Sequence, residues 1–265
     1  MNLATLTAGM GSPLLAPRGL PITPRQPPPG AHAADTQVMH RARVMRVLAL
    51  LFGLTVLGVA IMAAAFYPSI ASGDQASADV ARNIGFGAGV LALSTVALTV
   101  FFRWYAPLTA PLYAVTSGVF MAGLALGLEV RFPGIALQSL LVTLVVFVTL
   151  WGLHGAGLIQ VGRRLMILTY TATAAIALVY LLSFLFWLAG ARLPLIHEAG
   201  IGGILWSGFI VVVASLNLLL DFERIARLEG QLQPRYMPWF VGLGLMVTLV
   251  WLYISVLRLL ARLRR

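Results

Sequence analysis

The chain contains no cysteine and no lysine, and only 10% of its residues are charged. Without cysteine it has no disulfides, no thiolate metal sites and no cysteine nucleophile. The absence of lysine excludes a retinal-binding protein, because retinal needs a lysine amine for its Schiff base. With 60% of residues hydrophobic, there is too little charge to cover a water-soluble domain. The composition therefore predicts an integral membrane protein.

Seven apolar runs are each long enough to span a membrane, since about 20 apolar residues cross about 30 Å of hydrocarbon. They lie at residues 44–66, 84–102, 108–128, 135–153, 165–188, 201–220 and 239–260. Most prolines in this part of the chain fall between runs, and Pro111 and Pro238 lie near the first turn of a run, where a missing N–H does least harm. We predict an all-α fold in which residues 43–265 form one bundle of seven transmembrane helices.

The first part of the chain has a different composition. Seven of the 14 prolines lie within residues 13–29, with few large apolar side chains and no helical period. We therefore predict that residues 1–42 form a disordered tail. The first long apolar run follows only after the basic residues Arg41, Arg43 and Arg46, which favours a retained first span over a cleaved signal peptide.

All 18 basic residues are arginine, and the formal net charge is +10. They cluster in the connections and at the two ends of the chain, where guanidinium groups anchor to anionic headgroups and set topology. Nucleic-acid binding is the weaker interpretation of this charge, so we expect the lipid bilayer as partner and no nucleic acid. The composition indicates a multi-pass protein of a cell membrane.

Ionisable residues within a span are costly in lipid and are the first place to look for function. Asp221 follows the apolar run 210–220 directly, and Asn217 lies four residues earlier on the same helical face. A polar stripe of this kind suits an ion pathway or sensor. The alternative is a solvated aspartate at a helix end, paired with Arg224 or Arg227.

Other polar residues suggest a pathway less strongly. Thr248 and Ser255 are one heptad apart in the last span, with Arg258 near the same face as a candidate partner for Asp221. Such hydroxyls more often bond to helix backbone. Glu129 ends the third span and could be a conduit residue or an interfacial partner of Arg131. The sequence holds no catalytic motif, so we expect neither an enzyme nor a bound cofactor.

Four segments in order along the chain carry a family resemblance. They are residues 109–114 (TAPLYA), 132–138 (FPGIALQ), 217–225 (NLLLDFERI) and 244–253 (GLMVTLVWLY), the last followed by 257–260 (LRLL). Together they resemble the Bax inhibitor-1 family, and within it the bacterial branch. The resemblance extends from about Arg46 to the end of the sequence.

This resemblance implies a bundle whose last helix is central. For some bacterial members it implies a pH-sensitive calcium leak controlled by two aspartates on the last two helices. It also implies a bacterial cytoplasmic membrane, with calcium as a transported ion and not a cofactor. Asp221 matches the first aspartate, whereas Thr248 stands in place of the second and Ser255 in place of a glutamate. The rival function is a non-conducting interaction protein that regulates a membrane protease, and the missing acids favour it.

The arginine distribution predicts a cytoplasmic amino terminus. Nine arginines lie on the amino-terminal side of the bundle and three on the other: Arg41, Arg43, Arg46, Arg103, Arg163, Arg164, Arg224, Arg227 and Arg235 against Arg82, Arg131 and Arg192. The last four arginines oppose this bias, so either one span is re-entrant or the carboxyl terminus tolerates translocation. An Ala76→Cys variant of the cysteine-free chain should react with a membrane-impermeant thiol reagent in intact cells. If this position reacted only after the cells were lysed, the result would indicate the opposite topology.

Overall fold

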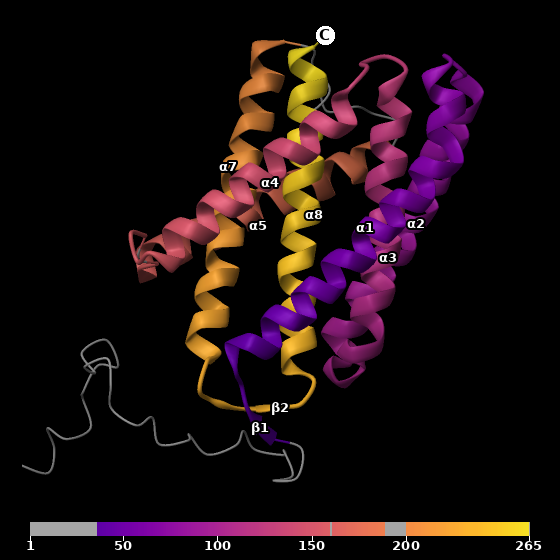
Figure 1. Ribbon diagram of the computed structural model, residues 1–265. Helices are drawn as coiled ribbons and strands as arrows, with labels where there is room; N and C mark the ends of the chain where they lie inside the picture. Colours follow the sequence, from indigo (N-terminus) through magenta and orange to yellow (C-terminus); the bar gives the residue numbers. More distant parts are fainter. Residues whose placement is uncertain (1–35, 160, 189–199, 265) are drawn as a thin grey trace, which may run out of the picture.

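The computed structural model describes residues 36–159, 161–188 and 200–264. Within them lie seven helices long and apolar enough to cross a membrane, which confirms the predicted fold class (Figure 1). Their bounds are α1 Arg41–Ala71, α2 Gln75–Phe101, α3 Ala106–Glu129, α4 Ile135–Gly155, α5 Arg163–Leu188, α7 Ile201–Leu228 and α8 Met237–Leu263. A short 3₁₀ helix, η4 (Arg103–Tyr105), joins α2 to α3.

The last helix, α8, is the centre of the bundle. It packs against α1, α3, α4 and α7, and Figure 1 shows it passing between the α1–α3 group and α7. In its most apolar window 67% of residues are buried, compared with 11% for α5 at the edge. The main hydrophobic core is accordingly built around α8 side chains such as Leu245, Leu252 and Leu257.

Helix α3 approaches α1 and α2 closely because glycines stand at the contacts. A Cβ atom added to Gly118 would clash with the carbonyl oxygen of Thr55 in α1. One added to Gly123 would lie 2.6 Å from the Ala81 carbonyl oxygen in α2. Small residues let helix backbones meet in lipid, where no hydrophobic force between helices exists. Gly118 and Gly123 thus permit the close approach of α3 to α1 and α2.

The connection between α1 and α2 is shorter than hydropathy predicted. Residues 67–83 were expected to link two spans, but α1 continues to Ala71 and α2 begins at Gln75. Asp74 caps α2 by accepting from the Ala76 N–H at 3.0 Å. A hydrogen bond from the Ser77 hydroxyl holds the pKa of the Asp74 carboxyl below its ordinary value. Hydropathy locates the lipid-embedded part of a helix and misses its polar turns.

A two-stranded sheet lies at the end of the bundle where α7 turns into α8. Strand β1 (Thr36–Val38) pairs antiparallel with β2 (Leu232–Pro234), with Gln37 opposite Gln233. Met39 continues this contact, because it exchanges backbone hydrogen bonds with Gly230 and Gln231. The structure therefore differs from the predicted disordered tail at its end: residues 36–39 pair with a loop far away in sequence, and α1 begins at Arg41. Residues 1–35 of that tail lie outside the described part.

Replacing Gly123 with alanine should destabilise the bundle. The added methyl group meets backbone atoms of α2, which cannot move aside as a flexible side chain could, and overpacking of this kind costs about 1–3 kcal/mol. Thermal unfolding of the purified protein in detergent would measure the loss. Gly87→Ala is the matched control, because a Cβ atom at Gly87 has nothing within 4 Å; equal melting temperatures for the two variants would contradict the close contact.

Candidate functional site

Asp221 lies inside the bundle. Helix α7 does not end at Leu220, as the apolar run suggested, but continues for two more turns to Leu228. The aspartate is only 6% exposed, and its neighbours Leu220 and Phe222 are buried as well. A carboxylate in this position is costly unless other polar groups satisfy it.

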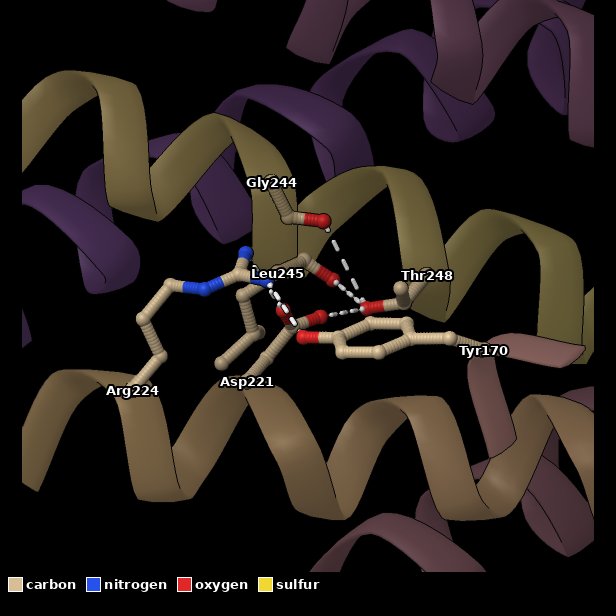
Figure 2. A network of polar contacts seen from close by, with 6 residues as sticks. All are labelled: Tyr170, Asp221, Arg224, Gly244, Leu245 and Thr248. Atoms are coloured by element: carbon tan, nitrogen blue, oxygen red, sulfur yellow. Dashed lines mark hydrogen bonds and ion pairs between the residues drawn. The ribbon is translucent and has the colours of Figure 1, made fainter. Parts of the chain in front are cut away.

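Two side chains bond the two oxygens of the Asp221 carboxylate (Figure 2). The Thr248 hydroxyl on α8 donates to Oδ2 at 2.7 Å, and Nη1 of Arg224 lies 3.3 Å from Oδ1. The same hydroxyl lies 2.8 Å from the Leu245 carbonyl oxygen in its own helix. Since a hydroxyl has one hydrogen, these acceptors are alternatives. The position where relatives are expected to carry a second aspartate thus faces Asp221.

Helix α5 joins the same group of polar residues. Arg224 extends from Asp221 to the Tyr170 hydroxyl, 3.2 Å from its Nη2 atom. One turn earlier on α7, the Asn217 amide donates to Thr173 Oγ1 at 2.7 Å. We call the contacts made by Tyr170, Thr173, Asn217, Asp221 and Thr248, with Arg224, the α5/α7/α8 polar seam. The sequence analysis does not single out Tyr170 and Thr173, although their spacing of three residues places both on one face of α5.

Arg258 is not the partner of Asp221. Helices α7 and α8 are antiparallel (Figure 1). Because Thr248 contacts Asp221, Arg258, ten residues further along α8, lies toward the opposite end of the bundle. Its guanidinium donates to the Tyr180 hydroxyl at 2.9 Å and stacks over that ring. Ser255 is buried and donates to the Trp251 carbonyl oxygen of its own helix. The partner was misjudged because a shared face on one helix does not give the distance to a second helix.

Glu129 contacts the start of α4 and does not pair with Arg131. Its carboxylate accepts from the backbone N–H groups of Gly134 at 2.6 Å and Ala136 at 3.1 Å. Gly134 has a φ of +79°, in the left-handed region that glycine adopts without strain. This turn brings the start of α4 back to the end of α3. Glu129 therefore caps α4, and Arg131 is not its partner.

The site carries little charge for a metal centre. Among the described residues, no group of three or more His, Cys, Asp or Glu side chains could hold a metal ion. The carboxylate of Asp221 is balanced by the guanidinium of Arg224 in the same helix. The arrangement suits a switchable polar contact between helices, or transient contact with a cation, more than stable metal binding.

Fold and site together define a multi-pass integral membrane protein with a buried polar contact between its last two helices. A family model described as "Bax inhibitor 1 like" matches residues 21–265. The chain belongs to this family, as the sequence resemblance suggested. No curated protein and no solved structure matches it.

The hydrogen bond between Thr248 and Asp221 should stabilise the bundle. Thr248→Val keeps the shape of the side chain but leaves one carboxylate oxygen without its donor, and an unsatisfied buried acceptor costs about 1–3 kcal/mol. Thermal unfolding in detergent would measure this. Thr116→Val is the control, because the Thr116 hydroxyl bonds only to carbonyl oxygens of its own helix. Equal losses of stability in the two variants would show that the bond between helices contributes no more than a bond within one helix.

Proposed function

We propose that this Bax inhibitor-1-like protein is a cation leak, with calcium as its ion, and that Asp221 is the residue that controls flux. We place it in the cytoplasmic membrane of a bacterium, as expected from the bacterial branch of the family. The observation that carries the proposal is the buried Asp221 carboxylate at the contact of α7 with α8. A buried carboxylate is costly inside a membrane bundle, so its presence supports an ion path or an ion sensor.

The polar seam supports a path along α7. Asn217, Asp221 and Arg224 lie on one side of this helix and meet hydroxyl groups of α5 and α8. Calcium prefers oxygen ligands, and carboxylate, hydroxyl and carbonyl oxygens all occur here. A single carboxylate binds a divalent ion weakly, which suits passage better than storage.

Arg224 gives the site its closed state. Its guanidinium occupies one side of the Asp221 carboxylate, so a cation must displace it before reaching that oxygen. Tyr170 offers a second partner for the same guanidinium, and a small rotation of Arg224 toward it frees the carboxylate. Protonation of Asp221 would also break the ion pair, with Arg224 and Tyr170 as the charged and titratable groups that face it. Flux through this site therefore depends on pH.

The alternative function is a non-conducting interaction protein that regulates another membrane protein such as a protease. One observation favours it: both oxygens of Asp221 already have partners from the chain itself. In that case the contact between Asp221 and Thr248 only stabilises the packing of α7 against α8. Flux above that of empty vesicles separates the two functions.

Asp221→Asn should reduce cation flux by about tenfold or more. The amide keeps the shape but removes the negative charge, which leaves the positive charge of Arg224 uncompensated beside the path; even about 1.4 kcal/mol of added repulsion gives this factor. Calcium uptake into liposomes that contain the purified protein would measure the effect. Glu223→Gln is the matched control, because Glu223 pairs with Arg227 outside the seam and should leave flux unchanged.

Two outcomes would count against this proposal. The wild-type protein could give no flux above empty vesicles, which favours the interaction protein. Alternatively, wild type and Asp221→Asn could conduct equally, which would return Asp221 to a structural role.

A further inference from the structure

A second polar site lies at the other end of the α5/α7/α8 contact. There the three helices enclose a cavity of about 20 Å³, which is room for about one water-sized group. Its polar lining residues are Tyr180 of α5, Trp206 and Ser207 of α7, and Ser255, Arg258 and Arg262 of α8. It shares no residue with the Asp221 seam.

Among the described residues, the lining of this cavity is rich in hydrogen-bond donors and contains no carboxylate. Nε1 of Trp206 is buried and has no hydrogen-bond partner, and an indole N–H can only donate. Ser207 adds a hydroxyl on a residue that is only 4% exposed. Arg258 uses one N–H on Tyr180, while a guanidinium has five. The missing partner of the Trp206 N–H is therefore an acceptor, and the nearby guanidinium of Arg258 favours a negatively charged one.

The cavity lies close to the boundary between the hydrocarbon and the lipid headgroups: the Cα atom of Arg258 is about 2.5 Å on the hydrocarbon side, and its long side chain can reach the headgroups from there. Helix α8 has 27 residues and is about 40 Å long, so it extends beyond about 30 Å of hydrocarbon by about 5 Å at each end. Arg258 lies five residues before its last residue, Leu263, or about 7.5 Å from the end. The Arg258 side chain is exposed, so this side of the cavity borders the surface of the bundle.

Apolar side chains beside the cavity face outward from the protein. Leu181 next to Tyr180 is 54% exposed, and Leu205 and Phe209 near Trp206 are 69% and 45% exposed. A free inorganic anion makes no use of such surfaces, whereas the acyl chains of a lipid pack on them. Charge and apolar contact together select a ligand that has an anionic head and a hydrocarbon tail.

We propose that this cavity binds an anionic phospholipid through an oxygen of its phosphate group. One phosphate oxygen enters the cavity and accepts from Trp206 and Ser207, and Arg258 contacts the phosphate from the rim. Guanidinium groups form strong, charge-assisted hydrogen bonds with phosphate. The small volume admits one oxygen and leaves the rest of the headgroup outside. This proposal does not depend on whether the protein conducts cations.

Native mass spectrometry of the full chain in detergent tests the site, with phosphatidylglycerol as the anionic probe and phosphatidylcholine as the neutral one. Wild type should bind phosphatidylglycerol at least about threefold more tightly. Arg258→Gln should weaken that binding about tenfold, and Trp206→Phe, which keeps most of the ring but loses the N–H, about threefold. Millimolar inorganic phosphate should not displace the lipid.

Arg264→Gln is the matched control. It removes the same charge at the same end of α8, but Arg264 bonds to Pro133 and Gln138 away from the cavity, so binding should change less than about twofold. Equal losses in Arg258→Gln and Arg264→Gln would indicate unspecific attraction and overturn the site. So would unchanged binding in Trp206→Phe, or full displacement of the lipid by inorganic phosphate. Unfolding of each variant without lipid separates binding from folding, and Trp206→Phe tests the site if Arg258→Gln does not fold.

Discussion

The structure depends on one constraint: a polar group within the hydrocarbon must find its partner inside the protein. Most hydroxyl groups in the spans meet it locally, as Thr55 and Ser139 do by bonding to carbonyl oxygens of their own helices. Only a few polar side chains bond across helices. Thr248 with Asp221, Asn217 with Thr173 and Arg224 with Tyr170 are three of them. The first joins α7 to α8, and the other two join α7 to α5. The constraint thus explains why the polar side chains around Asp221 bond to one another.

The sequence predicted the fold well because the fold depends on runs of apolar residues. The seven spans follow from these local patterns, and the central position of the last helix follows from the family resemblance. The pairing of residues 36–38 with the α7–α8 loop could not be predicted, since the bonds are between backbone groups and leave no mark in the side chains. The start of α2 was missed for a different reason. Asp74 caps this helix and Ser77 and Asp79 lie in its first turns, and hydropathy does not distinguish polar helix turns from a loop.

The sequence predicted the residues of the candidate site better than it predicted their contacts. Asp221 stood out as an ionisable residue at the end of an apolar run, and the family pattern brought Thr248 to attention. Arg258 was assigned to the wrong partner, and Tyr170 was overlooked, because both depend on how α5 and α8 are turned toward α7. A helical period gives the face of a residue on its own helix. The neighbour of that face is set by packing of the whole bundle.

Strand β1 connects the start of α1 mechanically to the turn between α7 and α8. Three residues of strand, together with the backbone bonds of Met39, fasten this turn to the chain that precedes α1. If α7 and α8 move apart at this end, the strand must either travel with one of them or unpair, and α1 is pulled along because it begins at Arg41. A movement of residues 36–39 likewise displaces the loop between the two helices that hold Asp221 and Thr248. A displacement of residues 36–39 is therefore expected to move α7 and α8 as well.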